Sequence, residues 1–185
     1  MTVPAAWPQP GFVIESPRLR LREIREDDAP LILEVLTDPD FIANVGSRGV
    51  HDLASARRYI TEAVCASYRS YGFGMYLVEL RADDAPVGIC GLLRRDYHPD
   101  VEIGLAFVPR GRGYGYALEA ARATLKLARD TLRLVRLVAL TAPHNRRSIQ
   151  ILERLGFHHE RMVRFAPEGP DLQLLAVSLA VSEVR

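Results

Sequence analysis

The feature that most constrains the fold is a glycine-rich segment between an apolar run and a helical pattern. The segment is Pro109-Arg-Gly-Arg-Gly-Tyr-Gly-Tyr-Ala-Leu-Glu-Ala120, and an apolar run over residues 101–108 precedes it. Glycines let the backbone approach a ligand closely, and the first N–H groups of a helix have no intrahelical partners. The order strand, glycine-rich turn and helix N-terminus therefore predicts a site for a phosphorylated ligand.

Three phosphate-binding patterns compete for this segment. A dinucleotide-binding turn needs G-x-G-x-x-G, but Tyr116 or Leu118 stands at the third glycine, depending on the starting glycine. A P-loop fails because Tyr116 occupies its second glycine position and no Lys-Ser/Thr pair follows. The pattern Gln/Arg-x-x-Gly-x-Gly/Ala fits residues 112–117 and, in a second frame, residues 110–115. A turn without a ligand and an Arg/Gly segment that binds RNA are the alternatives at this point.

Composition narrows these alternatives. The chain has 185 residues, of which 48% are hydrophobic, and a formal net charge of +1 at pH 7. These values are typical of one soluble globular domain, and the lack of a basic excess argues against a nucleic-acid partner. The two cysteines and scattered histidines give no metal-ligand spacing, and no apolar run approaches the ~18 residues of a membrane span. The N-terminus shows no signal pattern, so we expect a cytoplasmic protein with no metal and no membrane anchor.

Periodicity and turn signals predict a mixed α/β order of elements, β-α-α-β-β-β-α-β-α-β-β. Leu19 and Leu21 alternate on one face of the first strand, and Asp38-Pro39 is expected to end the first helix. Asp52 and Asn145 are good N-caps for two later helices. The predicted strands cover residues 18–24, 74–80, 86–94, 100–108, 134–141, 157–165 and 172–181, with a turn at 98–100, and the predicted helices cover 28–36, 53–71, 115–129 and 145–155.

Four segments in this order resemble the GCN5-related N-acetyltransferase (GNAT) family, in its ribosomal-protein-type branch. They are Glu15-Ser-Pro-Arg-Leu-Arg-Leu-Arg-x-Ile-Arg-Glu-Asp-Asp-Ala29, the glycine-rich segment, Asn145-x-x-Ser148 and Leu152-Glu-Arg-Leu-Gly-Phe157. The resemblance spans nearly the whole chain and implies one N-acetyltransferase domain over residues 15–185, behind an irregular arm over residues 1–14. It also implies a mixed α/β fold whose mostly antiparallel central sheet is split at the acyl-CoA site and flanked by about four helices.

The resemblance further implies acetyl-CoA as the cosubstrate. The backbone of the glycine-rich segment is expected to hold the diphosphate, and its two arginines are expected to add positive charge. The strand over residues 101–108 is expected to border the pantetheine channel and to supply one N–H group to the developing oxyanion. The expected cofactor-binding residues are Phe107, Val108, Arg110, Arg112, Gly113, Tyr114, Gly115, Tyr116, Ala117 and Asn145.

Acetyl transfer to an amine needs a base, since only the neutral amine attacks the thioester. Glu102 is the candidate catalytic base, acting through a water from the strand beside the thioester, and a plain strand charge or salt-bridge partner is the alternative. Many relatives supply an acid for the departing thiolate from a tyrosine, but none stands near Leu152. Ser148 is the candidate substitute, to orient the thiolate or a water, and a polar residue in the first turn of a capped helix is its alternative.

The sequence does not identify the acceptor. The resemblance places acceptor-binding loops at about residues 40–51, which include Arg48, and at about residues 164–171. A peptide or protein N-terminus remains open as the acceptor, as do small-molecule amines such as an amino-sugar antibiotic, an amino acid or a xenobiotic amine. A monomer and a homodimer also remain open. The missing tyrosine keeps a second class of function open, a non-catalytic CoA-binding or interaction module with the same fold.

Overall fold

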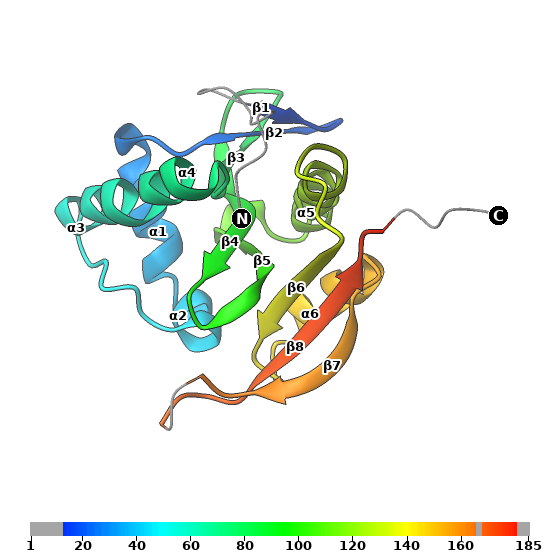
Figure 1. Ribbon diagram of the computed structural model, residues 1–185. Coiled ribbons are helices and arrows are strands. Elements are labelled where there is room, and N and C mark those ends of the chain that lie inside the picture. The colour runs from blue at the N-terminus through cyan, green and yellow to red at the C-terminus, as the bar shows by residue number, and fades with distance from the viewer. Residues whose placement is uncertain (1–12, 166–167, 181–185) are drawn as a thin grey trace.

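One twisted sheet organises the protein, whose computed structural model describes residues 13–165 and 168–180 (Figure 1). Eight strands within these residues form the sheet, in the order β1-β2-β3-β4-β5-β6-β8-β7. Every neighbouring pair is antiparallel except β5 and β6, so the predicted mostly antiparallel sheet is confirmed. The strands are β1 Val13–Glu15, β2 Leu19–Glu23, β3 Met75–Leu80, β4 Pro86–Arg95, β5 His98–Phe107, β6 Arg136–Thr141, β7 His158–Val163 and β8 Leu172–Ser178.

The short strand β1 is absent from the predicted order. It pairs antiparallel with β2, with Ile14 opposite Leu21. A strand of three residues is too short to show a period of two, so the sequence carries no local signal for it. It takes up the last two residues of the arm expected over residues 1–14, and residues 1–12 lie outside the described part of the chain.

The helices include one that the sequence analysis missed. The residue pair Asp38-Pro39 ends the first helix as predicted, but it also starts another. The Asp38 Oδ1 atom accepts a hydrogen bond from the Phe41 amide at 3.2 Å, and Pro39 takes the first helical position, where no N–H donor is needed. The helices are α1 Ala29–Thr37, α2 Pro39–Val45, α3 Leu53–Tyr59, α4 Cys65–Tyr71, α5 Tyr116–Lys126 and α6 Arg146–Arg154.

Two π-helical turns make some of these segments continuous. One turn, Ile60–Val64, joins α3 to α4, so that the helix predicted over residues 53–71 is continuous. The other, Leu127–Thr131, extends α5. No helix of the described residues is long and apolar enough to cross a membrane.

Local signals placed several other boundaries correctly and one turn incorrectly. The predicted N-caps are confirmed, since the side chain of Asp52 accepts from the Ser55 amide at 2.7 Å and that of Asn145 accepts from the Ser148 amide at 3.1 Å. The hairpin turn expected at residues 98–100 lies at residues 96–97 instead. His98 already belongs to β5 and is buried. Its Nδ1 atom accepts a hydrogen bond from the Asp100 amide within the strand.

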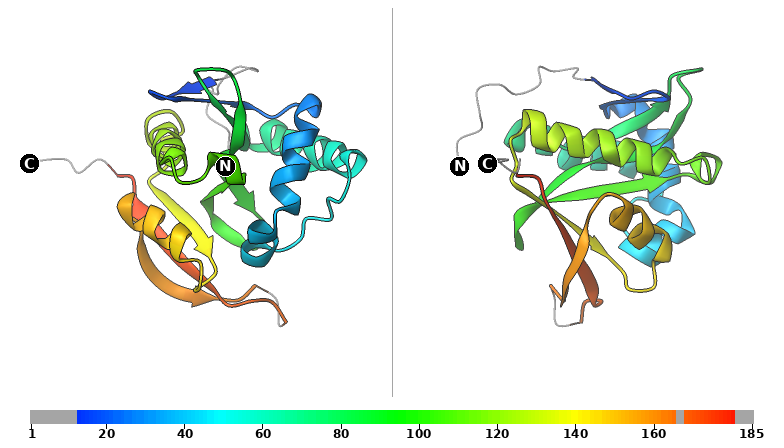
Figure 2. Two further views of the ribbon diagram at one scale, coloured as in Figure 1. Left: turned by 180° about the vertical axis from the view of Figure 1, so that it is seen from behind. Right: turned by 90° about the vertical axis from the view of Figure 1, so that its right-hand side faces the viewer.

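Helices cover both faces of the first half of the sheet (Figures 1 and 2). The alternation along β3 sets this, because Met75 and Leu77 point into the core under α1 and α3 while Tyr76 and Val78 point into the core under α5. Leu19 and Leu21 of β2, expected on one face, are both fully buried in the α5 core.

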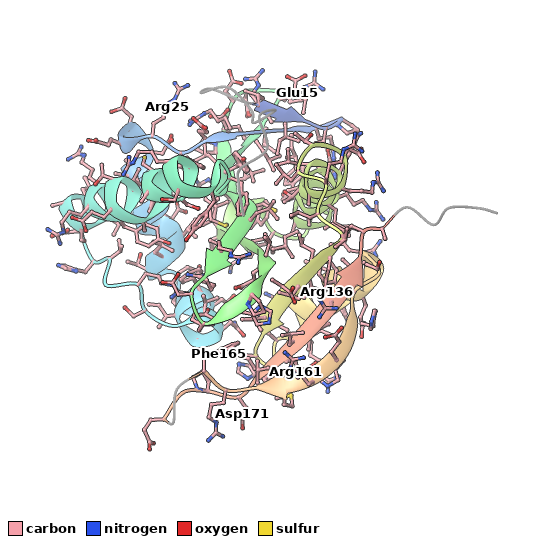
Figure 3. All side chains as sticks on the ribbon, viewed as in Figure 1. Glu15, Arg25, Arg136, Arg161, Phe165 and Asp171 are labelled. Carbon is pink, nitrogen blue, oxygen red and sulfur yellow. The ribbon has the colours of Figure 1, made fainter. Side chains whose placement is uncertain are left out.

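The sheet splits between β5 and β6. These parallel strands share one residue pair, Glu102 with Val138. Just before that pair, Arg136 of β6 (labelled in Figure 3) binds Asp100 of β5 at 3.0 Å and both carboxylate oxygens of Glu160 of β7 at 2.7 and 2.6 Å. This arginine therefore fastens three strands together where the split begins, and beyond Glu102 the two strands separate as predicted.

We expect Tyr68→Phe to lower the free energy of unfolding by about 2 kcal/mol, because it leaves two largely buried backbone groups without a partner. The Tyr68 hydroxyl accepts from the Ile24 amide at 3.0 Å and donates to the Met75 carbonyl, which links α4 to the sheet. Chemical denaturation measures the loss. The control is Tyr71→Phe on the same helix, since the Tyr71 hydroxyl has no recorded hydrogen bond to the described residues. Equal losses in the two variants would contradict the link.

Candidate functional site

A large cleft opens where β5 and β6 separate. Its volume is about 1320 Å³, and its walls include residues 103–107 of β5 and residues 139–141 of β6. The glycine-rich segment closes one side and α6 closes another. The divergence of the two strands therefore creates the cleft, and it leaves the facing backbone edges of β5 and β6 without a sheet partner along its length.

The glycine-rich segment forms the helix N-terminus that its sequence predicted. Gly113 and Gly115 have φ of +87° and +80°, a backbone conformation that side chains with a Cβ rarely adopt. The first hydrogen bond of α5 runs from the Glu119 amide to the Gly115 carbonyl at 3.1 Å. The amides of residues 116–118 therefore precede the helical ladder and are available to an anion at the cleft.

The two arginines of this segment are held by acidic partners. Arg112 donates to the Phe107 carbonyl at 2.7 Å, to Asp38 at 2.8 Å and to Asp40 at 2.9 Å. Arg110 pairs with a glutamate of α1, Glu34, and donates to the Pro86 carbonyl at 3.0 Å. Acidic side chains thus balance the charges of both arginines, so the two side chains offer a diphosphate less positive charge than the sequence analysis expected.

Arg112 connects the glycine-rich segment to α2. Its guanidinium contacts Asp38, the N-cap of that helix. Burial opposes ionisation of Asp38, but hydrogen bonds from Arg112 and from the Phe41 amide keep the pKa of Asp38 below its usual value. The carboxylate therefore stays charged at neutral pH, where it both caps α2 and pairs with Arg112 of the glycine-rich segment.

Three of the expected cofactor-binding residues do not line the cleft: Val108, Arg110 and Tyr114. Val108 is buried in the core under α1, and Tyr114 is 63% exposed and stacks on Tyr116 with ring centroids 5.5 Å apart. The expected residues that do line it are Phe107, Arg112, Gly113, Gly115, Tyr116, Ala117 and Asn145, together with Glu102 and Ser148.

Basic side chains of α6 line the cleft, and the sequence analysis missed them. They are Arg146, Arg147 and Arg154, with His144 just before the helix. Arg147 is 84% exposed and lies 3.8 Å from Asp40, so its charge is largely available. The signal was present in the sequence, because two arginines directly follow the capping residue Asn145.

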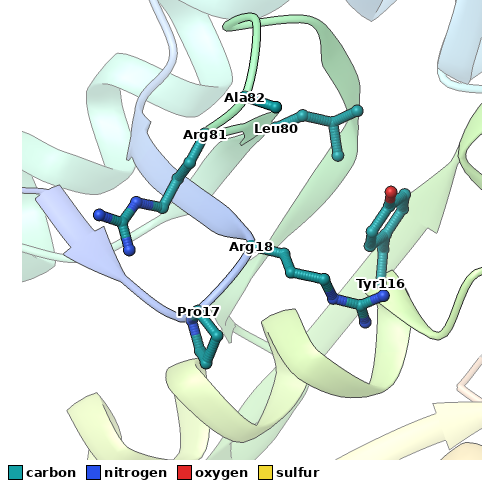
Figure 4. Close-up of a pocket in the computed structure, with 6 residues that line it drawn as sticks. All are labelled: Pro17, Arg18, Leu80, Arg81, Ala82 and Tyr116. Carbon is teal, nitrogen blue, oxygen red and sulfur yellow. The ribbon is translucent and has the colours of Figure 1, made fainter.

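A brace behind the glycine-rich segment holds α5 against the turn between β1 and β2. Glu119 accepts hydrogen bonds from the Arg18 amide and from the Ser16 hydroxyl, both at 2.8 Å, and its second oxygen pairs with the Arg18 guanidinium at 2.7 Å. Arg18 also donates to the Tyr114 carbonyl at 3.0 Å and lies 4.8 Å from the centre of the Tyr116 ring. Figure 4 shows Arg18 reaching toward Tyr116 at a small pocket on this side of the loop.

Glu102 stands at the point where the strands separate. Its side chain is 13% exposed, and its Oε2 atom lies 3.6 Å from Nε of Arg95. Burial raises the pKa of the Glu102 carboxyl above its ordinary value, and the charges of Arg95 and Arg48 oppose that rise. A largely buried carboxylate with a raised pKa, facing a cleft, has the properties of a general base.

The first turn of α6 brings Asn145 and Ser148 to the same cleft. The Asn145 side chain caps the helix, and the Ser148 hydroxyl makes no recorded hydrogen bond to the described residues. Residues 150–152 also line the cleft without a tyrosine, whereas Tyr59 of α3 lines it. Among the described residues, no group of three or more His, Cys, Asp or Glu side chains is placed to hold a metal ion.

Comparisons with known proteins agree with this arrangement. Residues 18–158 match the family model described as "Acetyltransferase (GNAT) domain". The uncharacterized protein YkkB of Bacillus subtilis is 30% identical over 155 residues, which cover 83% of this chain and 88% of that protein.

Two solved structures show the same fold. An acetyltransferase from Agrobacterium tumefaciens superposes with a TM-score of 0.76 at 26% identity, covering 90% of this chain and 94% of that one. A GNAT-family acetyltransferase from Bacillus anthracis gives a TM-score of 0.75 at 25% identity, covering 91% and 99% of the two chains.

We expect Glu119→Gln to lower the free energy of unfolding at pH 7 by about 1 kcal/mol, because it weakens the brace to Arg18 and Ser16. Burial opposes ionisation of Glu119, but these hydrogen bonds keep its pKa below the usual value. Its stabilising effect is therefore present above the pKa of an unfolded glutamate and is lost as the pH falls through the folded pKa.

Denaturation at pH 7 and at pH 3 measures this effect. The difference between the wild type and Glu119→Gln should shrink at pH 3. Glu62→Gln is the control, since Glu62 is exposed and has no recorded ion pair with the described residues. A difference that is unchanged by pH would show that the charge of Glu119 is unimportant.

Proposed function

Because this chain belongs to the GNAT acetyltransferase family, we propose that it transfers an acetyl group from acetyl-CoA directly to a primary amine. The observation that carries the proposal is the position of Glu102, a largely buried carboxylate at the start of the cleft between β5 and β6. The acceptor is a small molecule or a peptide. We further propose that residues 15–185 form a single catalytic domain and that the protein is cytoplasmic.

The cleft offers chemistry that suits each part of the cosubstrate. Amides at Gly113–Ala117 and at the start of α5 suit the diphosphate, and Gly113 leaves open space where a Cβ would stand. The free edge of β5 at Leu105 to Phe107 suits the amide groups of pantetheine. The charges of Arg110 and Arg112 are neutralised by acidic partners, and the arginines of α6 supply positive charge in their place.

The same arrangement supplies the groups that acetyl transfer needs. Glu102 takes the proton of the acceptor ammonium, directly or through a water, and the neutral amine then attacks the thioester carbonyl. A backbone N–H group of β5 stabilises the oxyanion that forms. Ser148 lies in the first turn of α6, where it orients the thiolate or a water, and Asn145 caps that helix and hydrogen-bonds pantetheine or the acceptor.

Direct transfer suits this site better than an acetyl-enzyme intermediate. Cys90 is fully buried beside Thr124, and burial raises the pKa of its thiol to about 12. Cys65 is on α4, and neither cysteine lines the cleft. In direct transfer, the site accelerates the reaction by holding the amine and the thioester close together in one complex.

Solved relatives of this fold act on unlike amines, so the fold alone does not select an acceptor. One neighbour is a ribosomal L7/L12 protein acetyltransferase, also determined with coenzyme A, and another is a spermidine N-acetyltransferase. They are 16–18% identical to this chain and share its fold. The alternative of a non-catalytic CoA-binding module rests on the missing tyrosine near Leu152. Release of free CoA from acetyl-CoA in the presence of amines decides between the two functions.

We expect Gly113→Ala to weaken CoA binding at least tenfold, because its methyl group would fill space that the diphosphate needs. The matched control is Gly156→Ala, at the end of α6. The two glycines have φ of +87° and +86°, so both variants carry a similar backbone strain of about 1 kcal/mol. Calorimetry with CoA on both folded variants is the measurement. Equal affinities would place the diphosphate elsewhere.

We expect Glu102→Gln to lower kcat/KM about 100-fold or more near neutral pH, and less at high pH where more of the amine is already neutral. In the wild type, kcat/KM should rise with increasing pH, with a midpoint above the pKa of an ordinary glutamate, because burial raises the pKa of Glu102. The variant should still bind acetyl-CoA. An equal loss at every pH would make Glu102 a positioning residue, and an unchanged rate would leave it as a strand charge.

A further inference from the structure

Two arginines surround Glu102 at the end of the cleft that faces α2. Arg95 is the last residue of β4, and Arg48 lies in the connection from α2 to α3, which can be followed in Figure 1. Both line the same cleft as Glu102. The Nε atom of Arg95 is buried, lies 3.6 Å from the Glu102 carboxylate and has no hydrogen-bond partner among the described residues. Arg48 is exposed, and no hydrogen bond or salt bridge to the described residues is recorded for it.

This end of the cleft has more positive than negative charge. Two guanidinium groups act on the single carboxylate of Glu102. Asp40 of the lining binds Arg112, and Asp100 of β5 binds Arg136. Asp96 in the turn of the hairpin is exposed to solvent and does not line the cleft. When Glu102 meets the ammonium of an acceptor, the arginines are left without a counter-charge.

Most of the other side chains at this end are apolar, and Asn44 of α2 is a polar exception. Leu93 lies opposite Glu102 in the β4–β5 ladder, and Phe41 and Val45 come from the helix that precedes Arg48. Tyr59 of α3 completes the lining on this side. These side chains offer contact to a hydrocarbon or aromatic group next to the charged one.

We propose that the acceptor is an amine that carries its own carboxylate and an apolar side chain, as an apolar amino acid does. The proposal rests on the proposed function and names its acceptor class. The carboxylate of the acceptor pairs with Arg48 and Arg95, in the forked geometry that guanidinium groups favour, while its ammonium faces Glu102. A polyamine brings further positive charges to the same two arginines and is disfavoured by repulsion.

The transfer step balances within this arrangement. The ammonium gives one proton to Glu102, and the neutral nitrogen forms a bond to the acetyl carbonyl carbon. The bond from that carbon to sulfur breaks, the nitrogen loses its second proton to water, and the CoA thiolate leaves. The product is an N-acetylamino acid that has lost its positive charge and keeps the carboxylate bound by the arginines.

Matched acceptors test the proposal. The measurement is release of free CoA from acetyl-CoA with L-leucine, L-methionine, L-phenylalanine and L-tryptophan, each compared with its own carboxamide, and with spermidine. The carboxamide keeps the amine and the side chain but has no negative charge. We expect kcat/KM for at least one acid to exceed that of its amide by about tenfold or more, and spermidine to be poorer than that acid. The amine of the amide is the easier to deprotonate, because no carboxylate stabilises its ammonium, so basicity alone predicts the opposite order.

A charge variant makes the test specific to the arginine. Arg48→Gln should raise KM for the preferred acid about tenfold and leave the amide unchanged, and Arg48→Lys should recover part of the loss. Arg94→Gln is the control, because Arg94 is exposed on the same strand as Arg95 and lies outside the cleft lining.

The outcomes separate this inference from the proposed function. Transfer to amides or spermidine with no preference for acids, or an equal loss for acid and amide in Arg48→Gln, overturns the acceptor class and leaves the acetyltransferase standing. No transfer to any of these amines by protein that binds acetyl-CoA also overturns the acceptor class, and the proposed function falls with it only if peptide amines release no CoA either.

Discussion

The site depends on the pairing of two parallel strands at a single residue pair. β5 and β6 meet at Glu102 and Val138, and Arg136 fastens the strands just before that point by binding Asp100 and Glu160. Unpaired backbone groups inside a protein are costly, so an opened sheet needs a ligand or water along its edges. The cleft, the free edge of β5 and the exposed start of α5 all follow from this one departure from regular pairing.

The same departure explains why a carboxylate is buried in the middle of a sheet. Glu102 occupies the last paired position, where its side chain is largely removed from water. Removing a carboxylate from water is unfavourable in free energy, and one contact with Arg95 at 3.6 Å offsets little of that desolvation penalty. A residue chosen for stability alone at this position would be apolar. The arrangement is understandable if the raised pKa of Glu102 is used to accept a proton.

Local patterns in the sequence predicted most of the fold, and non-local contacts account for what they missed. The alternation of Leu19 and Leu21, the caps at Asp52 and Asn145, and the turn into α5 all act within a few residues, so a reader of the sequence can find them. The start of α2 at Asp38-Pro39 was ambiguous, because the same two residues can end one helix and begin another. The acidic partners of Arg110 and Arg112 lie more than 70 positions away in the chain, and nothing in a local pattern indicates an ion pair at that distance. For the site, the sequence indicated Glu102, the glycine-rich segment and an acceptor loop that contains Arg48 as candidates, but the position of Arg48 and Arg95 beside Glu102 emerged only when the chain was folded.

The contact of Arg112 with Asp38 has a thermodynamic consequence for a two-substrate enzyme. Arg112 belongs to the loop proposed for the cosubstrate, and Asp38 caps α2, the helix that borders the proposed acceptor end of the cleft. Coupling between two binding sites is reciprocal, so whatever free energy one ligand adds to or removes from this shared contact changes the affinity for the other by the same factor. The ion pair thus provides a route for cooperativity between the two substrates, and its strength sets how far the first to bind prepares the protein for the second.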